Sequence, residues 1–381
     1  MSDVLRRPAA PPLLRALAGR AFALLWGGQA LSRLGDGLFQ VALAWWVLER
    51  SGSATAMASL LIAGLAPTLL LLLLGGVAGD RYPPVALMLG ADLLRGALVC
   101  VVAALAALGL LQLWHLYLLN LALGAVEAFF LPAYAAALPA LVAEDDLPSA
   151  NALTSASAQL SRIAGPALGA ACVAWGGVGL AFALNGLSFL AAAALLAPLL
   201  GRPPALRRAP GEPRPSLRAE VWAGLRTVLA TPWLWATILA FAVGNVALGG
   251  PYGVALPFLV DARFGADVGA LGLLYTLFAA GYLLGGLAVG QLRRLRWRGR
   301  LIYGALAAAG LALGAFALPL PLLALGALAL LNGAALEAGG LAWTSALQQL
   351  VPREQLGRVS SIDALGSDAL VPLGYAAAGW A

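Results

Sequence analysis

Apolar stretches of about twenty residues recur along almost the whole of this chain. A helix needs about 20 apolar residues to cross a bilayer. Stretches of this kind lie near residues 21–48, 54–79, 85–110, 114–142, 150–175, 178–200, 231–257, 268–291, 301–318, 321–346 and 361–381. None of them alternates apolar and polar residues as the strands of a membrane barrel do. The sequence therefore predicts an all-α polytopic membrane protein.

The composition supports the same prediction. Hydrophobic residues make up 62% of the 381 residues and charged residues only 10%, whereas a soluble domain carries about 25% charged residues. Such a chain cannot cover its own surface in water, so we expect a lipid bilayer around it. All of the 23 basic residues are arginine. Most lie in loops beside apolar stretches, so we expect no nucleic-acid partner.

The arginines also predict an orientation. They gather before the first apolar stretch, in the segment 201–220 and in the loop 292–300, whereas the intervening loops carry few. Cytoplasmic loops of membrane proteins hold an excess of basic residues. We therefore expect the amino terminus and the 201–220 segment in the cytoplasm.

The chain repeats itself in two halves. Residues 74–78 return as residues 284–288, an offset of about 210 that also separates Glu127 from Glu337. A duplication of six spans is typical of two-bundle transporters. We predict an amino-terminal six-helix bundle over 1–200, a linker over 201–230 that is irregular over 201–220, and a carboxy-terminal bundle over 231–381. The second half then holds five spans, so we expect the gene to continue with a twelfth.

Three carboxylates lie inside the apolar stretches. Asp36 has Arg33 one helical turn before it, whereas Glu127 and Glu337 have no charged neighbour close in the sequence. An ionised side chain in mid-membrane costs about 2.5–3.5 kcal/mol even on a lenient scale, and marks a functional candidate. We expect these three acids to contact the substrate or to carry protons, Glu127 first. In the alternative interpretation, Arg33 and Asp36 neutralise each other, and Glu127 and Glu337 form only helix-to-helix hydrogen bonds.

The end of the second span carries Gly76, Gly79, Asp80 and Arg81 in a G-x-x-G-D-R sequence. This sequence resembles the loop motif of the major facilitator superfamily. The basic residues that usually follow are replaced here by a Tyr-Pro-Pro sequence. We expect Asp80 to lie against the positive amino end of the eleventh span, near Ser360 and Ser361, because an acid is favourable at a helix start.

A second set of motifs is more specific. It comprises the Leu-Pro-rich segment 131–153, Asp92 with Arg95 in the third span, and the fifth-span residues Arg162, Gly165, Pro166 and Gly169. These resemble the bacterial branch of the superfamily that includes the enterobactin exporter and macrolide efflux proteins. The glycines and proline of the fifth span also resemble the motif of antiporters. In the alternative interpretation the glycines only pack helices, and Asp92 and Arg95 form a structural ion pair.

The resemblance implies a secondary transporter in the inner membrane of a bacterial cell. Such a transporter exports a small amphipathic or hydrophobic molecule, such as a drug, a macrolide or a siderophore, in exchange for protons. Uptake by symport is the rival within the same fold. A polytopic membrane enzyme is a weaker rival, because the chain has one histidine and two cysteines and such chemistry usually needs His or Cys clusters. We expect no metal and no cofactor, the proton gradient as the energy source, and a monomer.

Overall fold

The computed structural model describes residues 12–143, 146–200, 217–265, 267–290, 297–351, 359, 362–363 and 365–380. These residues form helices and turns without a strand, which confirms the all-α prediction. Eight helical segments in this part of the chain are long and apolar enough to cross a membrane. One of them, Ser149–Leu199, contains both the fifth and the sixth predicted spans. The eleventh predicted span, 361–381, is described only in part.

The helices divide into two compact units, residues 1–42 with 63–208 and residues 43–62 with 209–381. The elements up to residue 199 are the 3-10 helix η1 (Pro12–Ala18), α1 (Arg20–Ser51), α2 (Ala54–Arg81), α3 (Pro84–Ala107), α4 (Leu113–Leu141), α5 (Leu147–Leu196) and η3 (Ala197–Leu199). Those after residue 216 are α6 (Leu217–Ala230), α7 (Pro232–Gly250), the π-helix η4 (Pro251–Ala255), α8 (Leu256–Phe264), α9 (Val268–Gly290), α10 (Arg298–Gly314), η5 (Ala315–Ala317), α11 (Leu322–Leu350) and α13 (Val371–Trp380).

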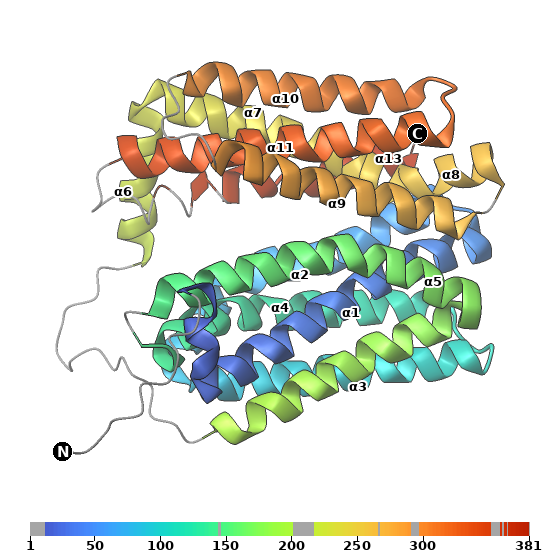
Figure 1. Ribbon diagram of the computed structural model, residues 1–381, viewed down its shortest axis with the longest axis horizontal. Coiled ribbons are helices and arrows are strands. Elements are labelled where there is room, and N and C mark those ends of the chain that lie inside the picture. Colours follow the sequence, from blue (N-terminus) through green and yellow to red (C-terminus); the bar gives the residue numbers. More distant parts are fainter. Residues whose placement is uncertain are drawn as a thin grey trace, which may run out of the picture. The chain divides into compact units, whose positions relative to one another are not determined.

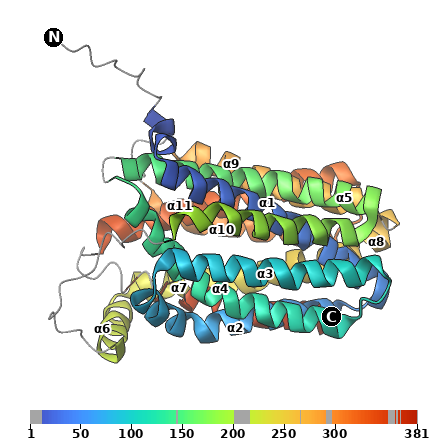
Figure 2. The ribbon, with the colours of Figure 1, turned by 90° about the horizontal axis from the view of Figure 1, so that it is seen from below.

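Neighbouring helices within each unit run roughly lengthwise beside one another (Figure 1). In the first unit α3 packs against α4 and α5. In the second unit α11 packs against α9 and α10, and α13 packs against α7. A second view shows the same long helices from below (Figure 2). The prediction of irregular structure over 201–220 is wrong for residues 217–220, which begin α6, and residues 201–216 lie outside the described ranges.

The fifth and sixth spans meet at Gly177. This residue has φ +71° inside the continuous helical run of α5. Glycine adopts this left-handed conformation without the steric cost that a side chain brings. The turn therefore falls between residues 175 and 178, where the sequence predicted one span to end and the next to begin.

Glycines bring matching pairs of helices close together in the two units. A Cβ atom on Gly75 of α2 would overlap the carbonyl of Ala128 on α4, and one on Gly285 of α9 would overlap the carbonyl of Ala334 on α11. Gly75 and Gly285 are the glycines of the repeated segment identified in the sequence. Small residues let membrane helices approach closely, because lipid provides little hydrophobic drive for their association. The repeat therefore corresponds to a repeated helix contact.

Gly124 offers a direct test of this packing. A Cβ atom there would overlap the carbonyl oxygen of Gly64 across the α2–α4 contact, whereas one on Gly90 of α3 would meet no atom within 4 Å. We expect Gly124→Ala to destabilise the protein by roughly 1–3 kcal/mol, as overpacking does. The control Gly90→Ala is expected to be neutral or stabilising, because alanine is the better helix former. Thermal unfolding in detergent measures both, and equal midpoints would contradict the contact.

Candidate functional site

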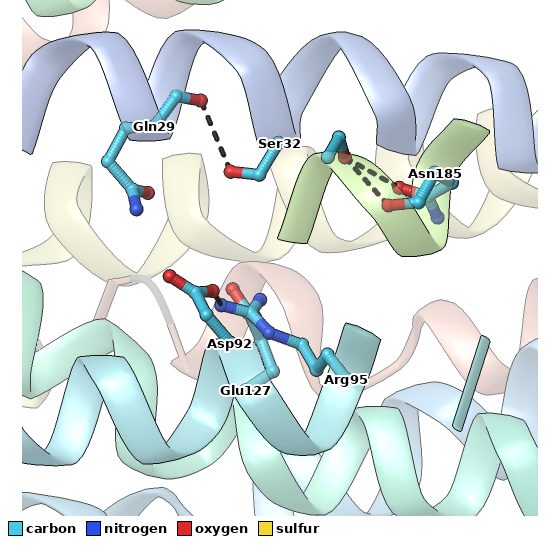
Figure 3. A network of polar contacts seen from close by, with 7 residues as sticks. Gln29, Ser32, Asp92, Arg95, Glu127 and Asn185 are labelled. Carbon is cyan, nitrogen blue, oxygen red and sulfur yellow. Dashed lines mark hydrogen bonds and ion pairs between the residues drawn. The ribbon is translucent and has the colours of Figure 1, made fainter. Parts of the chain in front are cut away.

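An arginine of the first unit is shared by two carboxylates. The Nη2 atom of Arg95 is 2.6 Å from Oδ1 of Asp92, and its Nη1 atom is 2.9 Å from Oε2 of Glu127. The three side chains converge in Figure 3. Asp92 and Arg95 lie three residues apart on α3, a spacing that places side chains on the same helix face, and Glu127 reaches them from α4. The predicted ion pair between Asp92 and Arg95 is therefore present, and Glu127, which is distant in the sequence, joins it.

The three charged groups differ in their access to solvent. The side chain of Asp92 is fully buried and that of Arg95 is 7% exposed, whereas that of Glu127 is 37% exposed. The guanidinium of Arg95 also lies over two aromatic rings, 4.1 Å from the centroid of Phe130 and 4.6 Å from that of Phe189. Such cation–π contacts hold a cation in a desolvated place. Glu127 is therefore the member of the cluster that can exchange with solvent most easily.

The side chain of Arg33 contacts α4 and α5. Its Nη1 atom donates to the carbonyl oxygen of Thr154 on α5 at 3.2 Å, and its guanidinium lies 5.6 Å from the ring centroid of Tyr134 on α4. No ion pair joins Arg33 to Asp36, both of which lie in the described part of α1, although Arg33 is among the charges that act on Asp36. Arg33 is instead held by two neighbouring helices.

Asp36 interacts electrostatically with the Arg95 cluster, which consists of Asp92, Arg95 and Glu127. Its side chain is exposed, and the charges that act on it most strongly are Arg95 and then Glu127, followed by Asp92 and Arg33. Two of the acids predicted to be functional, Asp36 and Glu127, therefore act on one another within the first unit. The tertiary fold brings them together from α1 and α4.

The motif of the fifth span packs beside Asp36. A Cβ atom on Gly165 would come within 2.9 Å of the Cα atom of Gly37, and one on Gly169 within 3.0 Å of the Cα atom of Leu38. These two glycines therefore let α5 touch the backbone of α1 at the residues that follow Asp36. Pro166 is buried between them and Arg162 is exposed. In this arrangement the two glycines hold α5 against α1 beside Asp36.

Glu337 has a different setting from Glu127. It lies on α11, where a Cβ atom on Gly286 of α9 would be 3.5 Å from its Cγ atom and 3.6 Å from its Oε1 atom. The residue that follows Arg95 by the repeat offset is Ala305 on α10. The two glutamates are thus matched in sequence, but the arginine that binds Glu127 has no counterpart at the matching position.

The loop motif falls mostly outside what the structure describes. Gly76, Gly79, Asp80 and Arg81 belong to the last turns of α2, but their side chains are not among those described. Ser360 and Ser361 also lie outside the described residues. The contact between Asp80 and the start of the eleventh span stays a prediction.

The chain as a whole matches a known family. The sequence profile of transmembrane secretion effectors, a part of the major facilitator superfamily, matches residues 12–377. The chain belongs to this family. It is therefore a multi-pass membrane protein of a transporter superfamily, as the motifs of the second and fifth spans predicted.

Relatives of this chain include exporters. The enterobactin exporters EntS of Shigella boydii and Escherichia coli are each 30% identical over 318 residues, which cover 80% of this chain and 73% of the relative. Among solved structures, a bacterial homologue of the human lysosomal transporter Spinster has a TM-score of 0.70 at 16% identity, covering 97% of this chain and 82% of that one. A bacterial homologue of the iron transporter ferroportin has a TM-score of 0.70 at 19% identity, covering 95% and 92%. These likenesses show the major facilitator fold.

The secretion-effector chain holds two further acids that the sequence analysis did not single out. Trp343 on α11 donates from Nε1 to both carboxylate oxygens of Asp363, at 3.1 and 3.0 Å. Asn245 on α7 donates to Oδ1 of Asp368 at 3.1 Å. Both acids lie within the eleventh predicted span, so the criterion that selected Glu127 would have found them. In the described residues, no group of three His, Cys, Asp or Glu side chains is placed to hold a metal.

Proposed function

We propose that this protein exports a small amphipathic or hydrophobic molecule from the cytoplasm of a bacterial cell in exchange for protons. The secretion-effector family and the relatives named as enterobactin exporters support export. The loops rich in arginine support a cytoplasmic amino terminus, and the bacterial relatives support a location in the inner membrane of a bacterial cell. A siderophore is the first substrate class to test, because that is what the named relatives export. The proposal includes no enzymatic step, no bound cofactor and no partner subunit.

One observation carries the proton coupling, namely that Arg95 is bound by Asp92 and Glu127 together. Removing one partner of a buried ion pair is strongly destabilising, by about 3–5 kcal/mol, because the remaining charge is uncompensated. Here the cation has two partners, so one carboxylate can accept a proton while the other still neutralises Arg95. The cluster can therefore alternate between two protonation states without leaving the arginine unpaired inside the membrane.

The difference in access supports the following division of roles. Glu127, 37% exposed, exchanges the proton, whereas the fully buried Asp92 holds Arg95 throughout. When Glu127 is protonated, its bond to Arg95 weakens and α3 and α4 lose one link between them. The proton state is thereby tied to the packing of two membrane helices, which is what coupling to a conformational change requires.

The test is transport by the purified chain in proteoliposomes. An imposed proton gradient is expected to drive substrate uphill against the direction of proton flow, with a panel of catecholate siderophores, macrolides and cationic drugs as substrates. The control is the same vesicles with a protonophore, which should stop uphill transport but not exchange. Substrate that moves in the same direction as the protons would replace antiport with symport. Uphill transport that continues in the presence of the protonophore would contradict proton coupling.

A further inference from the structure

A short helix lies across one end of the second unit. In both views α6 runs crosswise to the long helices of this unit (Figure 1, Figure 2). It is fixed there by Val228, which packs into one apolar cluster with residues near the ends of three long helices, Leu234, Ile302 and Leu347. The arginine-rich segments 201–220 and 292–300 join the chain at these ends. α6 therefore lies along the bilayer plane, at the level where the membrane is expected to meet the cytoplasm.

One face of α6 is left uncovered by the other described residues. Trp222 is 58% exposed and Leu229 is 62% exposed, and Arg226 between them is also exposed. Spacings of four and three residues place these side chains on one face of the helix, whereas Val228, on another face, is 3% exposed. A helix that bears Trp and Leu beside Arg and lies along the bilayer plane has the composition of an interfacial membrane helix.

The start of α10 carries the same combination of groups. Trp297 is 64% exposed, and Cζ of Arg300 lies over its ring at 4.2 Å from the centroid. Arg298 donates from Nη2 to Oε1 of Gln349, which fixes this end of α10 to the end of α11. Neither Arg226 nor Arg300 forms an ion pair with an acid in the described part of the chain. Both guanidinium groups can therefore neutralise an added anion.

The combination of arginine and exposed apolar side chains selects the anion. Arginine matches the geometry of phosphate, and basic residues beside a membrane span attract the anionic lipids of the cytoplasmic leaflet. A soluble phosphate would contact the arginines but would gain nothing from two tryptophans and a leucine in the same surface. A phospholipid supplies a phosphate for the arginines and an apolar boundary for the tryptophans, which favour the membrane interface.

We propose that α6 and the start of α10 form one binding surface for anionic phospholipids of the cytoplasmic leaflet. Trp222, Leu229 and Trp297 enter the boundary between the headgroups and the acyl chains. Arg226 and Arg300 bind lipid phosphates. The sequence from 293 to 300 holds five arginines and no acid, so its positive field favours anionic over zwitterionic lipid. This surface depends on the membrane location of the chain and not on the direction or the coupling of transport.

Native mass spectrometry of the purified chain tests the surface without any transport. The chain is titrated with dioleoyl phosphatidylglycerol and, separately, with dioleoyl phosphatidylcholine. We expect tighter binding of phosphatidylglycerol, weakened roughly fivefold by each of Arg226→Gln and Arg300→Gln. Arg50→Gln, which removes an exposed arginine at the far end of α1, is the matched control and should bind as the parent does.

Two outcomes of this titration would overturn the proposal. One is equal binding of phosphatidylglycerol and phosphatidylcholine by the parent, and the other is unchanged binding of phosphatidylglycerol by both arginine variants. Inorganic phosphate, added at the concentration of the lipid, should not displace it. Displacement would assign the arginines to a soluble anion and would also overturn the lipid surface.

Fluorescence quenching in vesicles tests the position of the apolar side chains. Phosphatidylglycerol with brominated acyl chains quenches a tryptophan that it contacts. The chain has 11 tryptophans, so the emission of one residue is the difference between the parent and its Trp→Phe variant. We expect Trp222→Phe and Trp297→Phe each to remove quenched emission, whereas Trp343→Phe, at a position 5% exposed, should remove unquenched emission. Unquenched emission from Trp222 and Trp297 would show that this surface faces water and would overturn the proposal, while the proposed export would still stand.

Discussion

Glu127→Gln is expected to abolish efflux against a concentration gradient while leaving passive substrate exchange. The glutamine retains an oxygen that can accept the hydrogen bond from Nη1 of Arg95, which Oε2 of Glu127 accepts at 2.9 Å. It cannot release or bind a proton. Because Asp92 still neutralises Arg95, the helices should remain packed, and only the coupling to protons should be lost. Uphill transport and exchange in the same proteoliposomes measure the two effects separately.

Glu49→Gln is the matched control for this experiment. Glu49 lies near the end of α1, is exposed, and accepts a hydrogen bond from Nε1 of Trp45 at 2.8 Å. The same chemical change there should leave uphill efflux unaltered. If Glu127→Gln concentrates substrate as well as the parent does, Glu127 is not the coupling residue, and Glu337 and then Asp36 become the next acids to test.

Arg95→Met is expected to have the largest effect on folding. It leaves the fully buried Asp92 without its cation and removes the partner of Glu127. Breaking a buried ion pair from one side costs about 3–5 kcal/mol, a large part of the stability of a typical domain. We therefore expect a poor yield of folded protein, a lower unfolding temperature in detergent, and no transport.

The double variant Arg95→Met with Asp92→Asn separates charge from shape. Replacing both members of a buried pair with uncharged groups is often neutral or stabilising. The double variant should therefore recover much of the unfolding temperature, but it should not recover proton-driven transport, because Arg95 no longer links α3 to α4. An unfolding temperature of Arg95→Met equal to that of the parent would contradict the structural role given to Arg95.

The sequence by itself determined the membrane class, the repeat and most span positions. These follow from properties of consecutive residues, since a stretch of about 20 apolar residues crosses a bilayer wherever it lies in the chain. The spans predicted at 54–79, 85–110 and 114–142 correspond to α2, α3 and α4. The break near residue 176 was likewise local, because Gly177 can adopt the left-handed conformation of the turn.

The charge cluster shows what only the tertiary structure decided. Asp92 and Arg95 are three residues apart and form an ion pair, whereas Arg33 and Asp36 have the same spacing and do not. The spacing places both pairs on one face of a helix, but it does not decide which partner an arginine prefers. Arg33 donates to the carbonyl of Thr154 on α5, and Arg95 gains Glu127 from α4.

Those neighbours depend on close helix contacts made by residues far apart in sequence. Gly165 and Gly169 bring α5 to α1 beside Asp36, and Gly75 and Gly124 bring α2 to α4. The sequence offered packing as the alternative role of Gly165 and Gly169, but it did not single out Gly124 and did not show which backbone each glycine would meet. A glycine permits close approach to any helix, so the partner is chosen by the packing of the whole unit. The apolar length of each span is a local property, whereas the pairing of charges across α1, α3, α4 and α5 is a property of the fold.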